Sequence, residues 1–82
     1  MPRLKENEYQ RIDREWNALC RSQMILLRIP TTEKLAKRMG CHQATAADRI
    51  RSPRYQKLDK LIETCKILHI DFDEVARIVK GS

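Results

Sequence analysis

Residues 42–51 combine polar side chains that can contact DNA base edges with small side chains that would let the chain approach them. Six residues of this stretch are candidates for base reading: His42, Gln43, Ala44, Ala47, Asp48 and Arg51. The amide of Gln43 can donate to and accept from adenine at once, and the methyl groups of Ala44 and Ala47 can approach thymine methyls. Gln43 is the strongest candidate, because it would stand in the first turn of a helix over residues 43–51.

Two of these residues also have simpler structural interpretations. His42 can serve as a weak helix cap in front of residue 43. Asp48 can pair with Arg51 or Arg49 one turn away, and we expect this pairing in preference to a contact with cytosine.

Basic residues are concentrated around this stretch. Residues 29–60 hold eight Lys or Arg against three Asp or Glu, which accounts for +5 of the formal net charge of +6. Such a run is often only a solvated surface, but here it adjoins the candidate base contacts and would attract the phosphates of a nucleic acid. The candidates for phosphate contacts are Arg49, Arg54, Tyr55 and Lys57. Depending on the register of the helix, Arg49 and Arg51 could reach either bases or phosphates.

The other reactive side chains are scattered. The chain has two His, three Cys and two Gly, with no Gly-rich loop and no C-x-x-C or H-x-x-x-H spacing. We therefore expect no enzyme activity, metal site, cofactor or small-molecule ligand. Cys20, Cys41 and Cys65 are odd in number and widely spaced, so we expect buried thiols in a reducing compartment.

The composition is typical of a small helical protein. Of 82 residues, 41% are hydrophobic, 34% charged and 5% aromatic, which predicts one all-α domain over residues 1–82. No apolar run is long enough for a membrane span, and residues 1–9 carry no apolar signal region. We expect a cytoplasmic protein without a membrane partner.

Hydrophobic periodicity and breaker residues predict five helices in a compact bundle, with the first of them long. Their approximate ranges are 5–29, 32–39, 43–51, 54–68 and 72–80. The first is expected to end before Pro30, with residues 24–29 enclosed by other helices. Residues 5–15 could pack on a second subunit or reach DNA, but we favour packing against the chain's own last helices.

Three helix ends have identifiable local signals. Ser52 followed by Pro53 could start the fourth helix at once. His69 either adopts a left-handed conformation or lengthens that helix by one residue. Asp71 and Glu74 form a D-x-x-E capping pair at the start of the last helix.

A tight turn joins the second and third predicted helices. Thr31 or Thr32 can cap the second helix, and Gly40 can end it because glycine takes a left-handed conformation without steric cost. Only a few residues then separate Gly40 from Gln43. Two short helices joined in this way predict a helix-turn-helix.

At these residues the sequence resembles the helix-turn-helix of the Cro/phage-repressor (XRE-like) transcription factors. Leu35, Ala36 and Gly40 match the first helix and the turn of that motif, and Ala46 matches a small residue of its second helix. The departure is Arg49, where the family usually has an apolar residue. Either Ile50 takes this role or the helix is rotated or starts one residue late. A weaker resemblance links the chain to lambdoid-phage activators of the CII type.

The resemblance implies a sequence-specific regulator that binds double-stranded DNA, most simply a repressor of phage or prophage type. It implies a phosphate contact at Thr32 and a loop over residues 52–56 along the DNA backbone, with the fourth helix starting near Lys57. It also implies pairing of two subunits through the last helix, so that a homodimer would read half-sites about 34 Å apart.

A different class of function is also compatible with the sequence. A helical protein-interaction module, such as an antitoxin or an inhibitor, can use the same fold to bind a protein. An exposed apolar patch on the first or last helix, with the basic face unused, would favour this alternative.

Overall fold

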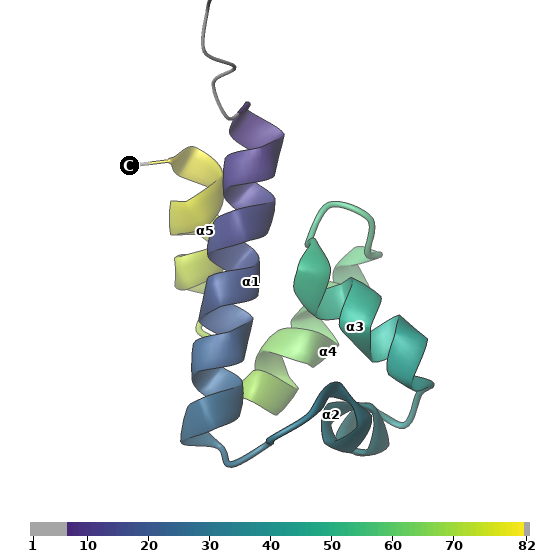
Figure 1. Ribbon diagram of the computed structural model, residues 1–82. Coiled ribbons are helices and arrows are strands. Elements are labelled where there is room, and N and C mark those ends of the chain that lie inside the picture. The colour runs from purple at the N-terminus through teal and green to yellow at the C-terminus, as the bar shows by residue number, and fades with distance from the viewer. Residues whose placement is uncertain (1–6, 82) are drawn as a thin grey trace, which may run out of the picture.

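Five helices build the fold, and the computed structural model describes residues 7–81 (Figure 1). They are α1 (Glu8–Leu26), α2 (Thr32–Met39), α3 (Gln43–Arg51), α4 (Leu58–Leu68) and α5 (Phe72–Lys80). The long helix α1 has α5 along one side and α3 and α4 on the other, with α2 beyond its C-terminal end (Figure 1). The all-α bundle of five helices is therefore confirmed, and the bounds of α2, α3 and α5 agree with the predicted ranges.

The start of α1 is set by a reciprocal cap. The Asn7 side chain accepts a 2.8 Å hydrogen bond from the backbone of Gln10, and the Gln10 side chain accepts one of 3.0 Å from the backbone of Asn7. This capping box satisfies two amide groups that the helix itself leaves unpaired. The predicted helix began at residue 5, which lies outside the described residues.

The end of α1 differs from the prediction. The helix ends at Leu26, and Arg28 adopts a left-handed conformation with φ of 58°. The amide of Ile29 then bonds back to Met24 over 2.8 Å, a Schellman motif that turns Ile29 into the core. The prediction that other helices enclose residues 24–29 was wrong in part, since Ile25 and Leu26 are 77% and 73% exposed.

The same motif ends α2 and α4. Gly40 is left-handed with φ of 70°, and Cys41 bonds back to Ala36 over 3.0 Å. His69 is also left-handed, with φ of 56°, while Ile70 bonds back to Cys65 over 2.8 Å. Of the two alternatives expected for His69, the residue therefore adopts the left-handed conformation and does not lengthen the helix. The strain of a non-glycine residue in this conformation is offset by burial of Ile70.

The start of α4 corrects the predicted range of 54–68. The helix begins at Leu58 with Lys57 at its N-cap, so Ser52 does not cap it. Ser52 has extended backbone, and its hydroxyl binds Asp13 of α1 instead. Residues 52–56 thus form a loop, which we call the α3–α4 loop. At α5 the N-cap is Asp71, as expected, but its side chain accepts from the backbone N–H of Asp73 over 3.1 Å and not from that of Glu74. Of the predicted D-x-x-E pair, only the capping role of Asp71 is therefore confirmed.

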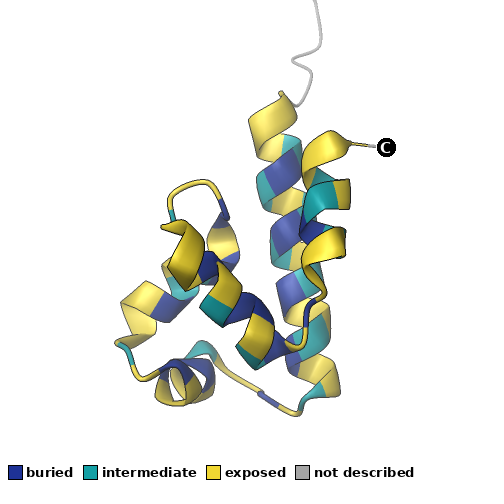
Figure 2. Cartoon of the chain, turned by 180° about the vertical axis from the view of Figure 1, so that it is seen from behind, coloured by how far each residue is buried: buried dark blue, intermediate teal, exposed yellow. Residues whose placement is uncertain are grey.

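The core lies where α1 meets the other helices. Figure 2 shows buried positions facing inward on every helix and exposed positions on the outer sides. Trp16 is fully buried at its centre, and the other large side chains excluded from solvent are Leu35, Ile50, Leu68, Thr64 and Cys20. Ile12 is buried, and Arg11 donates a 3.0 Å hydrogen bond to the carbonyl of Ile78 on α5. The first turns of α1 therefore pack on the chain's own last helix, as favoured.

Candidate nucleic-acid interface

Helix α3 buries one narrow side and leaves most of its other residues exposed. Ala46 and Ile50 are buried against the core. Thr45 is exposed, as are five of the six predicted base contacts: His42, Gln43, Ala44, Asp48 and Arg51. Ala47 is half-buried and lines a hollow of about 470 Å³ between α1 and α3. The six candidate base contacts thus lie along a single helix, with Ala47 turned toward α1.

The burial pattern answers the question of register left by Arg49. Ile50 takes the core position and α3 begins at Gln43. Arg49 is half-buried, and its Nη1 is enclosed without a hydrogen-bond partner among the described residues. Arg49 therefore does not share the exposed side of Arg51. Its contact with phosphate stays a prediction.

Gln43 is held by a residue of the preceding helix. Its Nε2 donates a 3.1 Å hydrogen bond to Oγ1 of Thr32, across the turn around Gly40. Thr31, not Thr32, caps α2, accepting from the backbone N–H of Lys34. Because the hydroxyl of Thr32 is not used in capping, it can fix the direction of the Gln43 amide.

Asp48 and Arg51 form the expected pair within α3. Arg51 Nη2 lies 2.7 Å from Asp48 Oδ1, with the two side chains 75% and 63% exposed. Such exposed pairs contribute little to stability. A phosphate or base could therefore displace Asp48 from Arg51 at small cost.

Side chains of α1 hold the C-terminal end of α3. Trp16 Nε1 donates to the carbonyl of Arg49 over 2.8 Å, and Asn17 Nδ2 donates to the carbonyl of Ile50 over 2.9 Å. Gln56 Nε2 adds a 2.6 Å hydrogen bond to the Arg49 carbonyl. The last carbonyls of a helix have no partner within it. These donors therefore satisfy them and fix the position of α3 on the body of the protein.

Asp13 anchors the α3–α4 loop. Its carboxylate accepts from Ser52 Oγ over 2.6 Å and from Arg54 Nη2 over 2.8 Å. The Arg54 guanidinium also lies 4.9 Å from the ring centre of Tyr9 and 4.8 Å from that of Tyr55. The hydrogen bond from Arg54 lowers the pKa of Asp13, with Ser52 adding to this, against an opposing effect of burial. Arg54 is thus part of the loop's own structure.

Asp13, Trp16 and Asn17 were not among the predicted site residues. They lie in the long first helix, and no local pattern in the sequence links them to residues 49–54. Of the remaining phosphate candidates, Tyr55 is 81% exposed and Lys57 is exposed at the N-cap of α4. Both lie at the same edge as Arg54.

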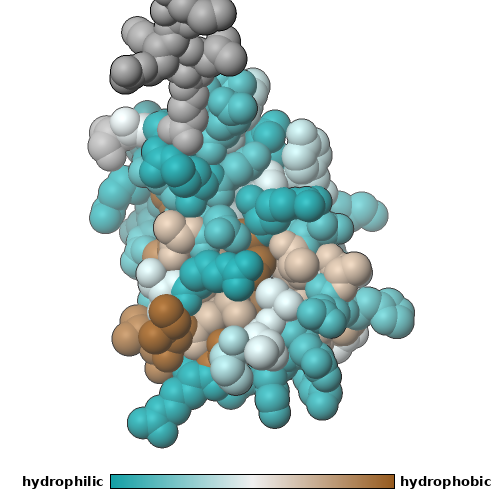
Figure 3. Space-filling view, viewed as in Figure 1, coloured by the Kyte–Doolittle hydropathy of each residue, from teal (hydrophilic) through white to brown (hydrophobic). Residues whose placement is uncertain are grey.

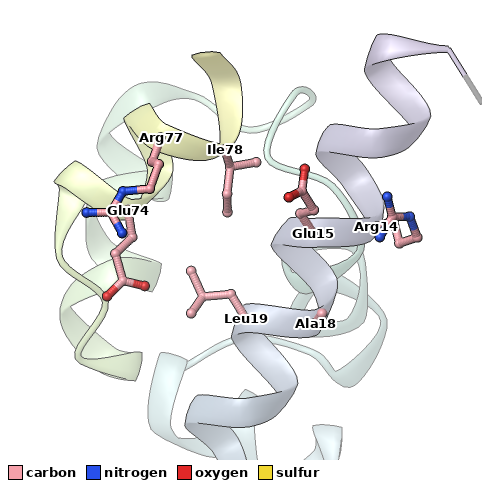
Figure 4. A pocket seen from close by; sticks show the side chains of 7 residues that line it. All are labelled: Arg14, Glu15, Ala18, Leu19, Glu74, Arg77 and Ile78. Carbon is pink, nitrogen blue, oxygen red and sulfur yellow. The ribbon is translucent and has the colours of Figure 1, made fainter. Parts of the chain in front are cut away.

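The groove between α1 and α5 is a separate hollow of about 280 Å³ (Figure 4). Leu19 and Ile78 point into it, while Glu15, Glu74 and Arg77 stand around it. Its rim carries both signs of charge.

Two thiols are buried, and the third is partly accessible. Cys20 and Cys65 are buried, whereas Cys41 is half-buried. Burial raises the pKa of both buried thiols, that of Cys20 further because Cys65 is near. Among residues 7–81 no three His, Cys, Asp or Glu side chains are grouped so as to hold a metal ion. None of the described helices has the length and apolar character needed to cross a membrane.

Comparison of the chain with models of protein families, with curated proteins and with solved structures gives no match. The function is therefore inferred from the geometry of α3 and its surroundings.

Proposed function

We propose that this protein is a sequence-specific double-stranded DNA-binding regulator that inserts α3 into the major groove. The observation that carries this proposal is the exposure of α3: it is held by its buried Ala46 and Ile50 and presents Gln43, Ala44 and Asp48 to solvent. The major groove is about 12 Å wide and admits one helix. Small side chains at residues 44 and 47 keep this one slim.

Within this proposal, Gln43 reads a base and Thr32 orients its amide. The 3.1 Å hydrogen bond between them leaves the Gln43 carbonyl oxygen and one N–H for the base edge. His42, Ala44 and Arg51 supply the other contacts to bases, whereas Ala47, which is half-buried toward α1, is left out of them. Asp48 keeps Arg51 extended along α3 until DNA is bound.

The phosphates on either side of the groove meet two edges of the protein. Thr32 lies at the start of α2, and Tyr55 and Lys57 lie at the α3–α4 loop. Arg54 also faces this edge, but its ion pair with Asp13 gives it mainly the role of shaping the loop. The net charge of +6 favours attraction of the whole chain to DNA.

A homodimer acting as a repressor is the simplest working form. Phe72 and Val79 of α5 are 45% and 50% exposed, which leaves apolar surface for a second copy. Two copies related by a twofold axis would read half-sites about 34 Å apart. Occupancy of such a site would block a promoter.

A salt titration tests DNA binding directly. Affinity for random-sequence duplex DNA is measured by fluorescence anisotropy from about 50 to about 300 mM salt, and we expect a steep linear fall of log K with log salt. Lys57→Gln should reduce the slope by about 1, because one phosphate contact is lost. The matched control is Lys80→Gln at the end of α5, which should leave the slope unchanged. No binding at any salt would overturn the proposal.

A protein-interaction module is the second candidate. The observation that favours it is the exposure of Ile25 and Leu26 at the end of α1. Selection of bound fragments from a random duplex pool separates the two functions. Enrichment of a symmetric sequence supports the DNA-binding dimer, and no enrichment supports a module that binds only protein.

A further inference from the structure

A second surface of the molecule combines apolar and basic side chains at the C-terminal end of α1. We call it the α1 corner, and it consists of Arg21, Ile25, Leu26, Arg28 and Pro30, all exposed. Single exposed apolar residues are common, but two large ones side by side are a patch. Figure 3 shows this apolar surface at the lower left, over the end of α1.

The backbone explains why these side chains face outward. The Schellman motif at Arg28 directs Met24 and Ile29 into the core, where both are 3% exposed. Between them, Ile25 and Leu26 face solvent, whereas Leu27 is half-buried against the core. Because the turn is fixed by backbone hydrogen bonds, the apolar pair is presented on rigid structure.

A shallow hollow lies beside Ile25. It has a volume of about 430 Å³ and is lined by Met24, Ile25, Arg28, Ile29 and Pro30. Apolar walls with a single cation at the edge suit an apolar side chain of a partner that carries negative charge next to it.

The charges of the α1 corner indicate which partner fits. From Trp16 to Thr32 the sequence contains Arg21 and Arg28 but no Asp or Glu. A second copy docked corner to corner would bring like charges together, which is unfavourable. An acidic partner would instead bring opposite charges together around the apolar contact.

The hollow beside Ile25 is separate from the one that borders α3. It is lined by residues from the stretch 24–30 and by no residue of α3, whereas Arg21 also lines the separate hollow between α1 and α3. The apolar contacts of a partner in the hollow beside Ile25 would therefore lie outside the hollow that α1 forms with α3.

We propose that the α1 corner binds an acidic peptide segment of another protein. Apolar side chains of the segment occupy the hollow beside Ile25 and contact the exposed Leu26, and its carboxylates face Arg21 and Arg28. This surface does not depend on DNA binding, so failure of one proposal leaves the other standing.

The test uses the isotope-labelled full chain and two synthetic peptides of about 15 residues, long enough to form a helix when bound. Both carry Leu along one helical face; one has Glu and the other Lys on the remaining faces. Titration followed by backbone amide chemical shifts should show binding of the Glu peptide, with the shifts centred on residues 21–30. The Lys peptide should bind about tenfold more weakly or not at all.

Variants assign the binding to the corner. Ile25→Ser with Leu26→Ser should weaken binding of the Glu peptide about tenfold or more, since both anchors are lost. Leu58→Ser is the matched control, because Leu58 is an exposed apolar residue of α4 outside the corner. Arg21→Gln with Arg28→Gln should weaken binding and reduce its dependence on salt.

Four results would overturn the proposal. They are no binding of the Glu peptide, equal binding of both peptides, shifts that leave residues 21–30 unchanged, and equal loss of binding in Leu58→Ser. Sedimentation of the free protein and binding to anionic phospholipid vesicles are measured in parallel. If the free protein self-associates or binds vesicles, and the Ile25 and Leu26 double variant abolishes this, the proposal is wrong. The partner of the α1 corner is then a second copy or a membrane and not an acidic segment.

Discussion

The carboxylate of Asp13 accepts a 2.6 Å hydrogen bond from the hydroxyl of Ser52, which lies 39 residues further along the chain. The same carboxylate binds Arg54 through Nε and Nη2 at 3.2 and 2.8 Å. One side chain of α1 therefore fixes the loop that follows α3. In this protein the first helix supports the proposed DNA-reading helix from its C-terminal end.

Stability should depend on the ionisation of Asp13. Its pKa in the folded state is lowered from the usual value of 3.8, chiefly by the hydrogen bond from Arg54. The stabilisation is therefore present in full above about pH 3.8 and is lost as pH falls through the lowered pKa. We expect Asp13→Asn to reduce the free energy of unfolding at pH 7 by roughly 1 kcal/mol, because the buried Ser52 hydroxyl keeps a weaker partner.

Urea unfolding of both proteins from pH 7 to about pH 2.5 measures this effect. The difference between wild type and Asp13→Asn should shrink as pH falls below 3.8. A difference that stays constant over this range would show that the charge of Asp13 is not responsible.

Substitution of the left-handed residues at the ends of α2 and α4 should change the free energy of unfolding in opposite directions. Gly40→Ala should lower the free energy of unfolding by about 1 kcal/mol. A Cβ at Gly40 would meet no atom within 4 Å, so the cost comes from the backbone conformation alone. His69→Gly relieves the corresponding strain and should raise stability by up to about 1 kcal/mol. Chemical unfolding at neutral pH measures the free energy of unfolding of both variants. If both substitutions raise it, or both lower it, the interpretation is wrong.

Base preference should depend on Gln43 and on the residue that orients it. Gln43→Ala should lose about 1–3 kcal/mol of discrimination between the selected site and one with a single changed base pair. Thr32→Ala should lose less, because Gln43 remains but is no longer held. Lys57→Gln should weaken binding to both sites alike. Competition binding with the two duplexes measures these effects; equal loss of discrimination from Gln43→Ala and Lys57→Gln would contradict the assigned roles.

The three thiols should differ in reactivity with a disulfide reagent such as DTNB. Cys41 is half-buried and should react first at pH 8 in the native protein. Cys20 and Cys65 are buried with raised pKa values, so little thiolate forms and access is blocked. Cys20 and Cys65 should therefore react only after the protein unfolds. The time course of absorbance, with Cys41→Ser as the control, shows whether one thiol reacts early and two react late.

Much of the fold follows from local sequence signals. The bounds of α2 were predictable because Thr31 can cap its start and Gly40 can end it. The bounds of α3 and α5 were predictable for similar reasons, since both helices are short and end at clear breaks in periodicity. The two errors arose where distant residues decide the local conformation. α1 ends early because burial of Ile29 stabilises the turn at Arg28, and α4 starts late because Asp13 binds the Ser52 hydroxyl.

In the candidate site, too, some features follow from the local sequence and others depend on residues far apart in the chain. The sequence by itself determined which side chains α3 carries and that those at residues 44, 46 and 47 are small, because side-chain size is a local property. Only the tertiary structure decided that Ile50 rather than Arg49 enters the core, and that Asp13, Trp16 and Asn17 support α3 and the α3–α4 loop. These contacts join residues far apart in the chain, and they form only when α1 packs across the end of α3.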